Sequence, residues 1–139
     1  MTENKNIQEK YMGLNIIPLN DKKVPVVRNW TDATNYERNT TLTQSGKHGK
    51  YYGVLTGEAN EIVVFDYDTQ KEGDNAGKVV DCDGNIHDLP KLIETYGESA
   101  YIVKTRSGGF HVYCKLDADS PTQTTKVKGC IDVRNTNGY

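Results

Sequence analysis

Residues 62–68 read Ile-Val-Val-Phe-Asp-Tyr-Asp and indicate both the fold and the chemistry expected of this chain. The apolar, β-branched run predicts a buried strand, and it ends in Asp66 and Asp68. Side chains alternate across a strand, so these two carboxylates point to the same face. Two like charges held side by side repel each other unless a cation lies between them. Because hard divalent ions such as Mg²⁺ take carboxylate oxygens, the pair predicts a metal clamp for nucleotide chemistry.

Length, charge and cysteine content limit the classes of protein to consider. The 139 residues fit one domain, expected to span 1–139, with room for a two-layer core. A net charge of −2 gives no global basic field, so a nucleic-acid partner would need a local patch. The cysteines Cys82, Cys114 and Cys130 form no Cys-x-x-Cys pair, which argues for reduced thiols in a cytosol-like compartment and against a zinc site. No apolar stretch approaches membrane-spanning length, so no membrane partner is expected.

The hydrophobic pattern predicts more strand than helix. Strands are expected at residues 13–19, 51–55, 61–68, 101–105, 110–115 and within 127–134. The strand at 61–68 follows the one at 51–55 at hairpin distance. Hairpins in place of regular βαβ alternation predict an α+β fold with a mostly antiparallel or mixed sheet.

Helices are expected around residues 33–39 and at 88–97, where Asp88 suits the cap and Gly97 the end. Residues 69–85 and 116–126 are polar and predict loops with little regular structure.

Polar side chains gather on one face of several predicted strands. Alternation turns His111 and Tyr113 away from the apolar face of their strand, and Asp132 shares a polar face with Arg134. If these strands are neighbours of the acid-bearing strand, one surface carries three carboxylates beside a histidine and cations. Two metals about 3.5–4 Å apart on such a surface would activate an attacking hydroxyl and stabilise a leaving pyrophosphate.

The order of these motifs resembles that of the archaeo-eukaryotic primase superfamily, and most closely the primase–polymerase domains (bifunctional DNA primase/polymerase, N-terminal) of plasmid, phage and large-virus replication proteins. The resemblance covers most of the chain. It rests on Gly13 to Pro18, Lys22 to Pro25, Trp30, Gly53 to Gly57, Val64 to Asp68, Thr105 to Tyr113, Ile131 to Arg134, and Gly138-Tyr139.

The resemblance implies a fold, a site and partners. The fold would be an RRM-like palm sheet with a small N-terminal α/β unit, and the site would lie in the cleft between them. Asp66, Asp68 and Asp132 would bind Mg²⁺ or Mn²⁺ and act in catalysis, while Ser107 and His111 would meet the phosphates or sugar of an incoming nucleotide. Arg134 would contact phosphate.

The activity implied is template-directed nucleotidyl transfer by a DNA primase/polymerase with a two-metal mechanism. Substrates would be an NTP or dNTP and a single-stranded DNA template, with a helicase domain in the parent protein. The location would be cytoplasmic, in a plasmid-, phage- or virus-encoded replication protein. The family usually continues past Gly138-Tyr139, so the chain is expected to be C-terminally truncated.

Each motif also has a simpler interpretation. Asp-x-Asp after a strand is more often a strand end than a metal site, and Ser-Gly-Gly is by itself a hairpin turn. His111 could be a solvated surface histidine, and Asp132 with Arg134 a surface ion pair that adds little stability. The order of the motifs favours the metal site.

Three other functions stay open. A non-catalytic module that binds nucleotide or single-stranded nucleic acid is the main alternative, and a metal-dependent phosphatase or nuclease would use the same acids. A rolling-circle nicking enzyme is disfavoured, because the sequence has no His-x-His pair.

Overall fold

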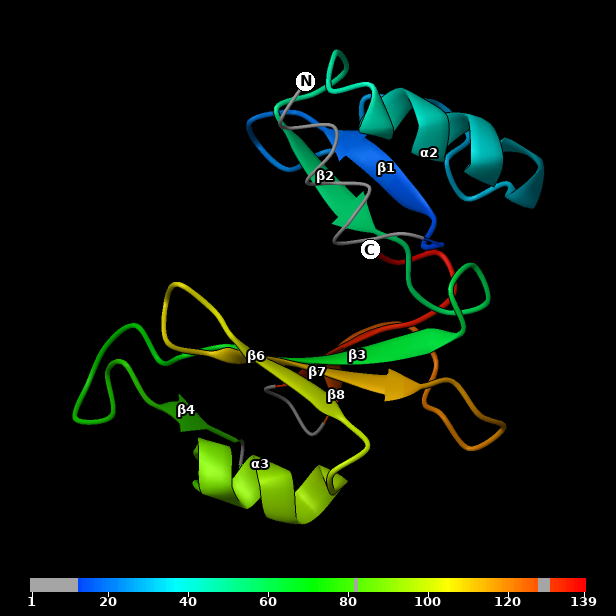
Figure 1. Ribbon diagram of the computed structural model, residues 1–139. Coiled ribbons are helices and arrows are strands. Elements are labelled where there is room, and N and C mark those ends of the chain that lie inside the picture. The colour runs from blue at the N-terminus through cyan, green and yellow to red at the C-terminus, as the bar shows by residue number, and fades with distance from the viewer. Residues whose placement is uncertain (1–12, 82, 128–130) are drawn as a thin grey trace.

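Five antiparallel strands form the main sheet of the computed structural model, which describes residues 13–81, 83–127 and 131–139 (Figure 1). The strand order is β6-β7-β3-β9-β8. The strands are β3 (Ile62–Tyr67), β6 (Tyr101–Lys104), β7 (Phe110–Lys115), β8 (Thr124–Val127) and β9 (Ile131–Arg134). The apolar run at residues 62–67 therefore forms the central strand, between β7 and β9.

One face of this sheet is covered by helix α3 (Leu89–Tyr96) (Figure 1). The side chain of Asp88 accepts a hydrogen bond from the backbone amide of Lys91, which caps the helix, and Gly97 ends it with a φ of 77°. The core beneath the helix consists of Tyr67, Val79, Leu92, Phe110, Val112 and Ile131. Because side chains alternate along a strand, the packing of Tyr67 against α3 directs Asp66 to the opposite face.

A small N-terminal unit lies on the other side of the sheet, away from α3 (Figure 1). Its strands β1 (Ile16–Leu19) and β2 (Tyr51–Val54) pair with each other, and helix α2 (Tyr36–Gln44) packs on β1. A 3-10 turn (Ala33–Asn35), capped by Asp32, precedes α2. The helix expected around residues 33–39 is thus present, but it extends further, to Gln44.

The α+β class, the antiparallel main sheet and the small N-terminal unit are confirmed. Three local expectations were incomplete or wrong. β2 and β3 do not form a hairpin, because β2 belongs to the N-terminal sheet and β3 to the main sheet. The expected loop at 69–85 contains the short strand β4 (Val79–Val80), which pairs antiparallel with β5 (Ile86–His87) directly after it, and both valines are buried. The polar loop at 116–126 runs into β8.

Cys114 is a free, half-buried thiol, while Cys82 and Cys130 lie outside the described residues. Among the described residues, no helix has both the length and the apolar character needed to cross a bilayer.

Candidate metal centre

Three neighbouring strands bring His111, Asp66 and Asp132 into one row across the sheet. Asp66 on β3 is directly opposite His111 on β7 and directly opposite Asp132 on β9. Directly opposed residues of antiparallel strands project from the same face, so the three side chains share a surface. In the next row, Val64 is opposite Tyr113 and Arg134, which therefore lie on that surface too.

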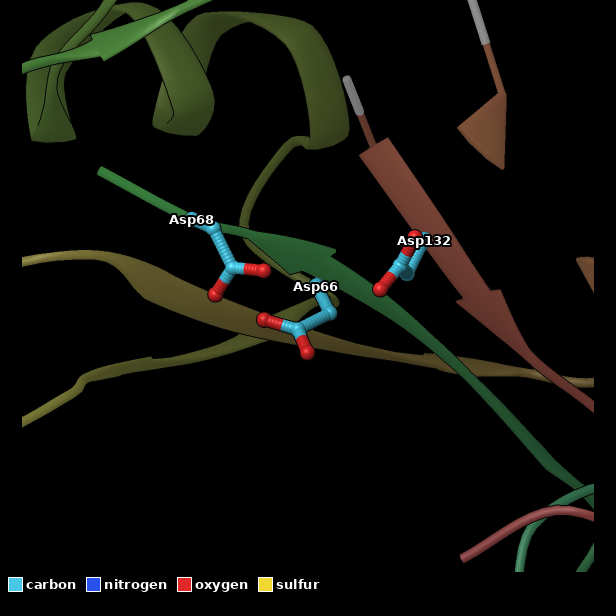
Figure 2. Close-up of side chains that lie close together, drawn as sticks. All are labelled: Asp66, Asp68 and Asp132. Atoms are coloured by element: carbon cyan, nitrogen blue, oxygen red, sulfur yellow. The ribbon is translucent and has the colours of Figure 1, made fainter. Parts of the chain in front are cut away.

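The carboxylates of Asp66, Asp68 and Asp132 point toward one another (Figure 2). One oxygen from each residue lies within 4.8 Å of the others. The side chains of Asp66 and Asp132 are only 16% and 13% exposed, while Asp68 is exposed at the end of β3. Three acids so close together, two of them largely removed from water, repel one another strongly unless positive charge compensates.

Arg134 and His111 supply positive or polar partners on the same face. A guanidinium nitrogen of Arg134 lies 3.5 Å from Oδ2 of Asp132 and 3.9 Å from Oδ2 of Asp66. Nε2 of His111 lies 3.3 Å from Oδ1 of Asp66. Burial raises the pKa of Asp66, but contact with His111 and the charge of Arg134 outweigh burial, so its pKa lies below the usual value. Asp66 is therefore ionised at neutral pH.

The donor set fits a hard divalent cation. Mg²⁺ and Mn²⁺ favour carboxylate oxygens, and this site offers three. Oδ1 of Asp66 is also buried and makes no hydrogen bond within the described residues, although Nε2 of His111 lies 3.3 Å away. A buried anionic oxygen left in this state is costly, and a metal ion would compensate that cost.

A cavity of about 470 Å³ opens beside the carboxylates, between the main sheet and the N-terminal unit. Asp66, His111 and Arg134 line it from the sheet. Lys23, Tyr51, Tyr52, Tyr113 and Tyr139 also line it. The cavity thus combines acidic and cationic side chains with a wall rich in tyrosine.

Ser107 lies apart from that cavity. It is exposed in the β6–β7 hairpin, where its hydroxyl is 3.2 Å from the hydroxyl of Thr105. Gly109 of the same hairpin packs so closely on the carbonyl of Tyr67 that a Cβ would collide with it. The hairpin therefore lies beside the end of β3, near the point where Asp68 follows, and Ser107 is not among the residues that line the described cavity.

The sequence placed Tyr113 on the face of His111, but it assigned none of the cavity tyrosines to the site. Nine tyrosines are spread along the chain, and their number alone does not distinguish cavity residues from core residues. A signal did exist for Tyr113, because it lies two residues from His111 on one strand and so shares its face. Tyr51, Tyr52 and Tyr139 reach the cavity only through the packing of the two units, which no local pattern encodes.

Comparison with known proteins identifies one family. The model of the family described as "Bifunctional DNA primase/polymerase, N-terminal" matches residues 8–139. Neither the curated proteins nor the solved structures give a match.

Proposed function

The chain belongs to the bifunctional DNA primase/polymerase N-terminal family, and from this premise we propose that it carries out template-directed nucleotidyl transfer at the three-aspartate site. In the proposed reaction, a 3′-hydroxyl attacks the α-phosphate of an NTP or dNTP and displaces pyrophosphate. The observation that carries the proposal is the approach of three carboxylate oxygens to within 4.8 Å of one another, on the sheet face that carries His111.

Asp66, Asp68 and Asp132 would hold Mg²⁺ or Mn²⁺. Two bound ions would lower the pKa of the attacking hydroxyl and neutralise the leaving pyrophosphate. The largely buried carboxylates of Asp66 and Asp132 come from central strands, so their positions are fixed before any ligand arrives. Such preorganisation lowers the cost of assembling the site during each turnover.

Cationic and hydrogen-bonding groups surround the acids and suit a triphosphate. Arg134 borders the cavity and carries a fork of donors that matches phosphate oxygens. His111 lies in the same row as the acids and can donate a hydrogen bond to phosphate. For Ser107 we propose a phosphate or sugar contact on the Asp68 side of the site, supported by the position of its hairpin beside the end of β3.

We further propose that residues 1–139 act as one catalytic domain, because both units contribute walls to the cavity. A single-stranded DNA template and a helicase domain in the parent protein would be the partners, supported by the family membership. A cytoplasmic replication protein of a plasmid, phage or virus would provide this setting.

Extension of a labelled oligonucleotide tests the proposal. Wild-type protein with Mn²⁺ should add the nucleotide complementary to the template, whereas Asp66→Asn and Asp132→Asn should abolish addition. Asp119→Asn, which changes an exposed acid in a turn, is the matched control and should retain it. Binding of nucleotide and single-stranded DNA that survives Asp66→Asn, with no addition by the wild type, would favour a binding module. Hydrolysis that needs no template would favour a nuclease or phosphatase.

A further inference from the structure

Tyr139 occupies a fixed position in the wall of the cavity. Its hydroxyl donates a hydrogen bond of 2.9 Å to the backbone carbonyl of Lys23. Its ring meets that of Trp30 in a T-shaped contact with centroids 5.3 Å apart. A Cβ at Gly53 would lie 3.0 Å from Cδ2 of Tyr139, so glycine there lets the ring lie closely on β2. Three separate parts of the N-terminal unit therefore hold this one ring.

The backbone that leads to the ring is fixed as well. The amide of Thr56 donates to the carbonyl of Gly138 at 3.0 Å, and the amide of Gly138 donates to the carbonyl of Asn135 at 2.8 Å. The buried hydroxyl of Thr56 donates to that same Asn135 carbonyl at 2.7 Å. The ring therefore needs little reordering when a ligand arrives, and preorganised groups bind at lower entropic cost.

Despite these contacts, Tyr139 is still 38% exposed. It borders the cavity that Asp66, His111 and Arg134 line on the sheet side. A flat, held, partly exposed ring is a surface on which a nucleobase can stack, whatever its identity. Tyr51 is a less suitable platform, because the ammonium of Lys50 already lies 5.9 Å over its ring centroid.

We propose that Tyr139 is the stacking platform for the base of the nucleotide whose triphosphate lies at Asp66, His111 and Arg134. The proposal rests on the proposed function, since it takes the nucleotide site as given. It assigns the charged side chains of the cavity to the phosphates of the ligand and the ring of Tyr139 to its base. Stacking accepts any base, so selection among bases is left to the template.

Calorimetric titration with two probes tests the platform. The probes are a dNTP and inorganic tripolyphosphate, each added to the full chain with Mn²⁺. Tyr139→Leu should weaken dNTP binding by about tenfold or more, and should leave tripolyphosphate binding within about twofold. Tyr139→Phe keeps the ring and should keep dNTP binding. Tyr101→Leu is the matched control, because Tyr101 is 70% exposed on β6 and does not line the cavity.

A second readout needs no variant. Trp30 is the sole tryptophan of the chain and touches Tyr139, so a base stacked on Tyr139 should change its fluorescence. We expect the dNTP to produce this change and tripolyphosphate not to do so. A 2′-deoxyribose 5′-triphosphate that lacks a base should also bind the wild type more weakly than the dNTP.

Different results would refute the stacking role of Tyr139 and the proposed function of the site. If Tyr139→Leu loses equal affinity for both probes, or loses affinity for neither, Tyr139 is not the stacking platform. The proposed metal and phosphate site would be unaffected by that result. Equal wild-type affinity for the dNTP and its baseless analogue would lead to the same conclusion. Failure of the wild type to bind either probe with Mn²⁺ would overturn the proposed function and the platform together.

Discussion

Asp66 and Asp132 stand directly opposite each other on β3 and β9, and the guanidinium of Arg134 reaches both carboxylates from one position. In the metal-free protein, the positive charge of Arg134 therefore reduces the repulsion between these two carboxylates. A divalent cation would deliver more charge to the same oxygens and leave Arg134 available for phosphate. We therefore propose two roles for the Arg134 side chain, charge compensation and phosphate binding, which experiment can separate.

Arg134→Gln should lower the free energy of unfolding of the metal-free protein by about 1 kcal/mol, a modest value because the guanidinium is about one-third exposed. The physical reason is repulsion between carboxylates that have lost their counter-charge. Mn²⁺ should reduce the difference in the free energy of unfolding between variant and wild type, because the ion replaces the lost positive charge. Urea unfolding with EDTA and with Mn²⁺ measures both values. A difference that Mn²⁺ does not change would count against this role.

His111→Gln should weaken binding of inorganic tripolyphosphate by about tenfold, since a charge-assisted hydrogen bond to phosphate is lost. His48→Gln changes an exposed histidine of the N-terminal unit and is the control. Calorimetric titration with Mn²⁺ present measures the two affinities. Equal affinities in the two variants would show that His111 does not meet phosphate.

Much of the sheet and of the acidic cluster could be predicted from the sequence, because both follow from the two-residue period of strands. That period puts Asp66 and Asp68 on one face, turns His111 away from the core, and pairs Asp132 with Arg134. The sequence did not contain the register that joins β7, β3 and β9. The structure supplies that register and brings the side chains together.

The rest could not be predicted because it depends on contacts between distant segments. The turn after Val54 is compatible with a hairpin, yet it carries the chain from one sheet to the other, where Gly57 packs on Thr136. The two-residue strands at 79–80 and 86–87 are too short for any periodic signal. Tyr139 meets Trp30 and Lys23 only through tertiary packing.

Gly57→Ala should destabilise the protein more than Gly73→Ala. Both glycines have a positive φ, 74° and 86°, so each alanine costs roughly 1–2 kcal/mol in backbone strain. A Cβ at Gly57 would also collide with the backbone of Thr136, whereas Gly73 has open space, and such overpacking adds about 1–3 kcal/mol. Chemical denaturation of the two variants gives the difference. Equal losses would mean that the close approach of Gly57 to Thr136 is not a tight contact.

Stability at low pH should depend on Asp81. Contact with His87 at 2.9 Å and a hydrogen bond from the amide of Asn85 hold the pKa of Asp81 well below its usual value. A carboxylate with a depressed pKa stabilises the fold above its unfolded-state pKa of about 4, and that contribution is lost as the pH falls toward the folded-state value.

Asp81→Asn should therefore be less stable than the wild type above about pH 4, and the gap should shrink below that pH as Asp81 becomes protonated. Asp74→Asn, at an exposed position of the same segment, is the control. Thermal unfolding across the acid range measures the gap. A stability difference between wild type and Asp81→Asn that stays constant down to the lowest pH would show that the low pKa of Asp81 does not stabilise the fold.

Binding of Mn²⁺, measured by electron paramagnetic resonance of the free ion with a nucleotide present, tests most directly whether the three aspartates form one metal centre. The wild type and Asp119→Asn should bind Mn²⁺ alike, while Asp66→Asn and Asp132→Asn should each lose roughly tenfold or more in affinity. If both Asp66→Asn and Asp132→Asn bind Mn²⁺ with the affinity of the wild type, the three aspartates do not form a metal centre.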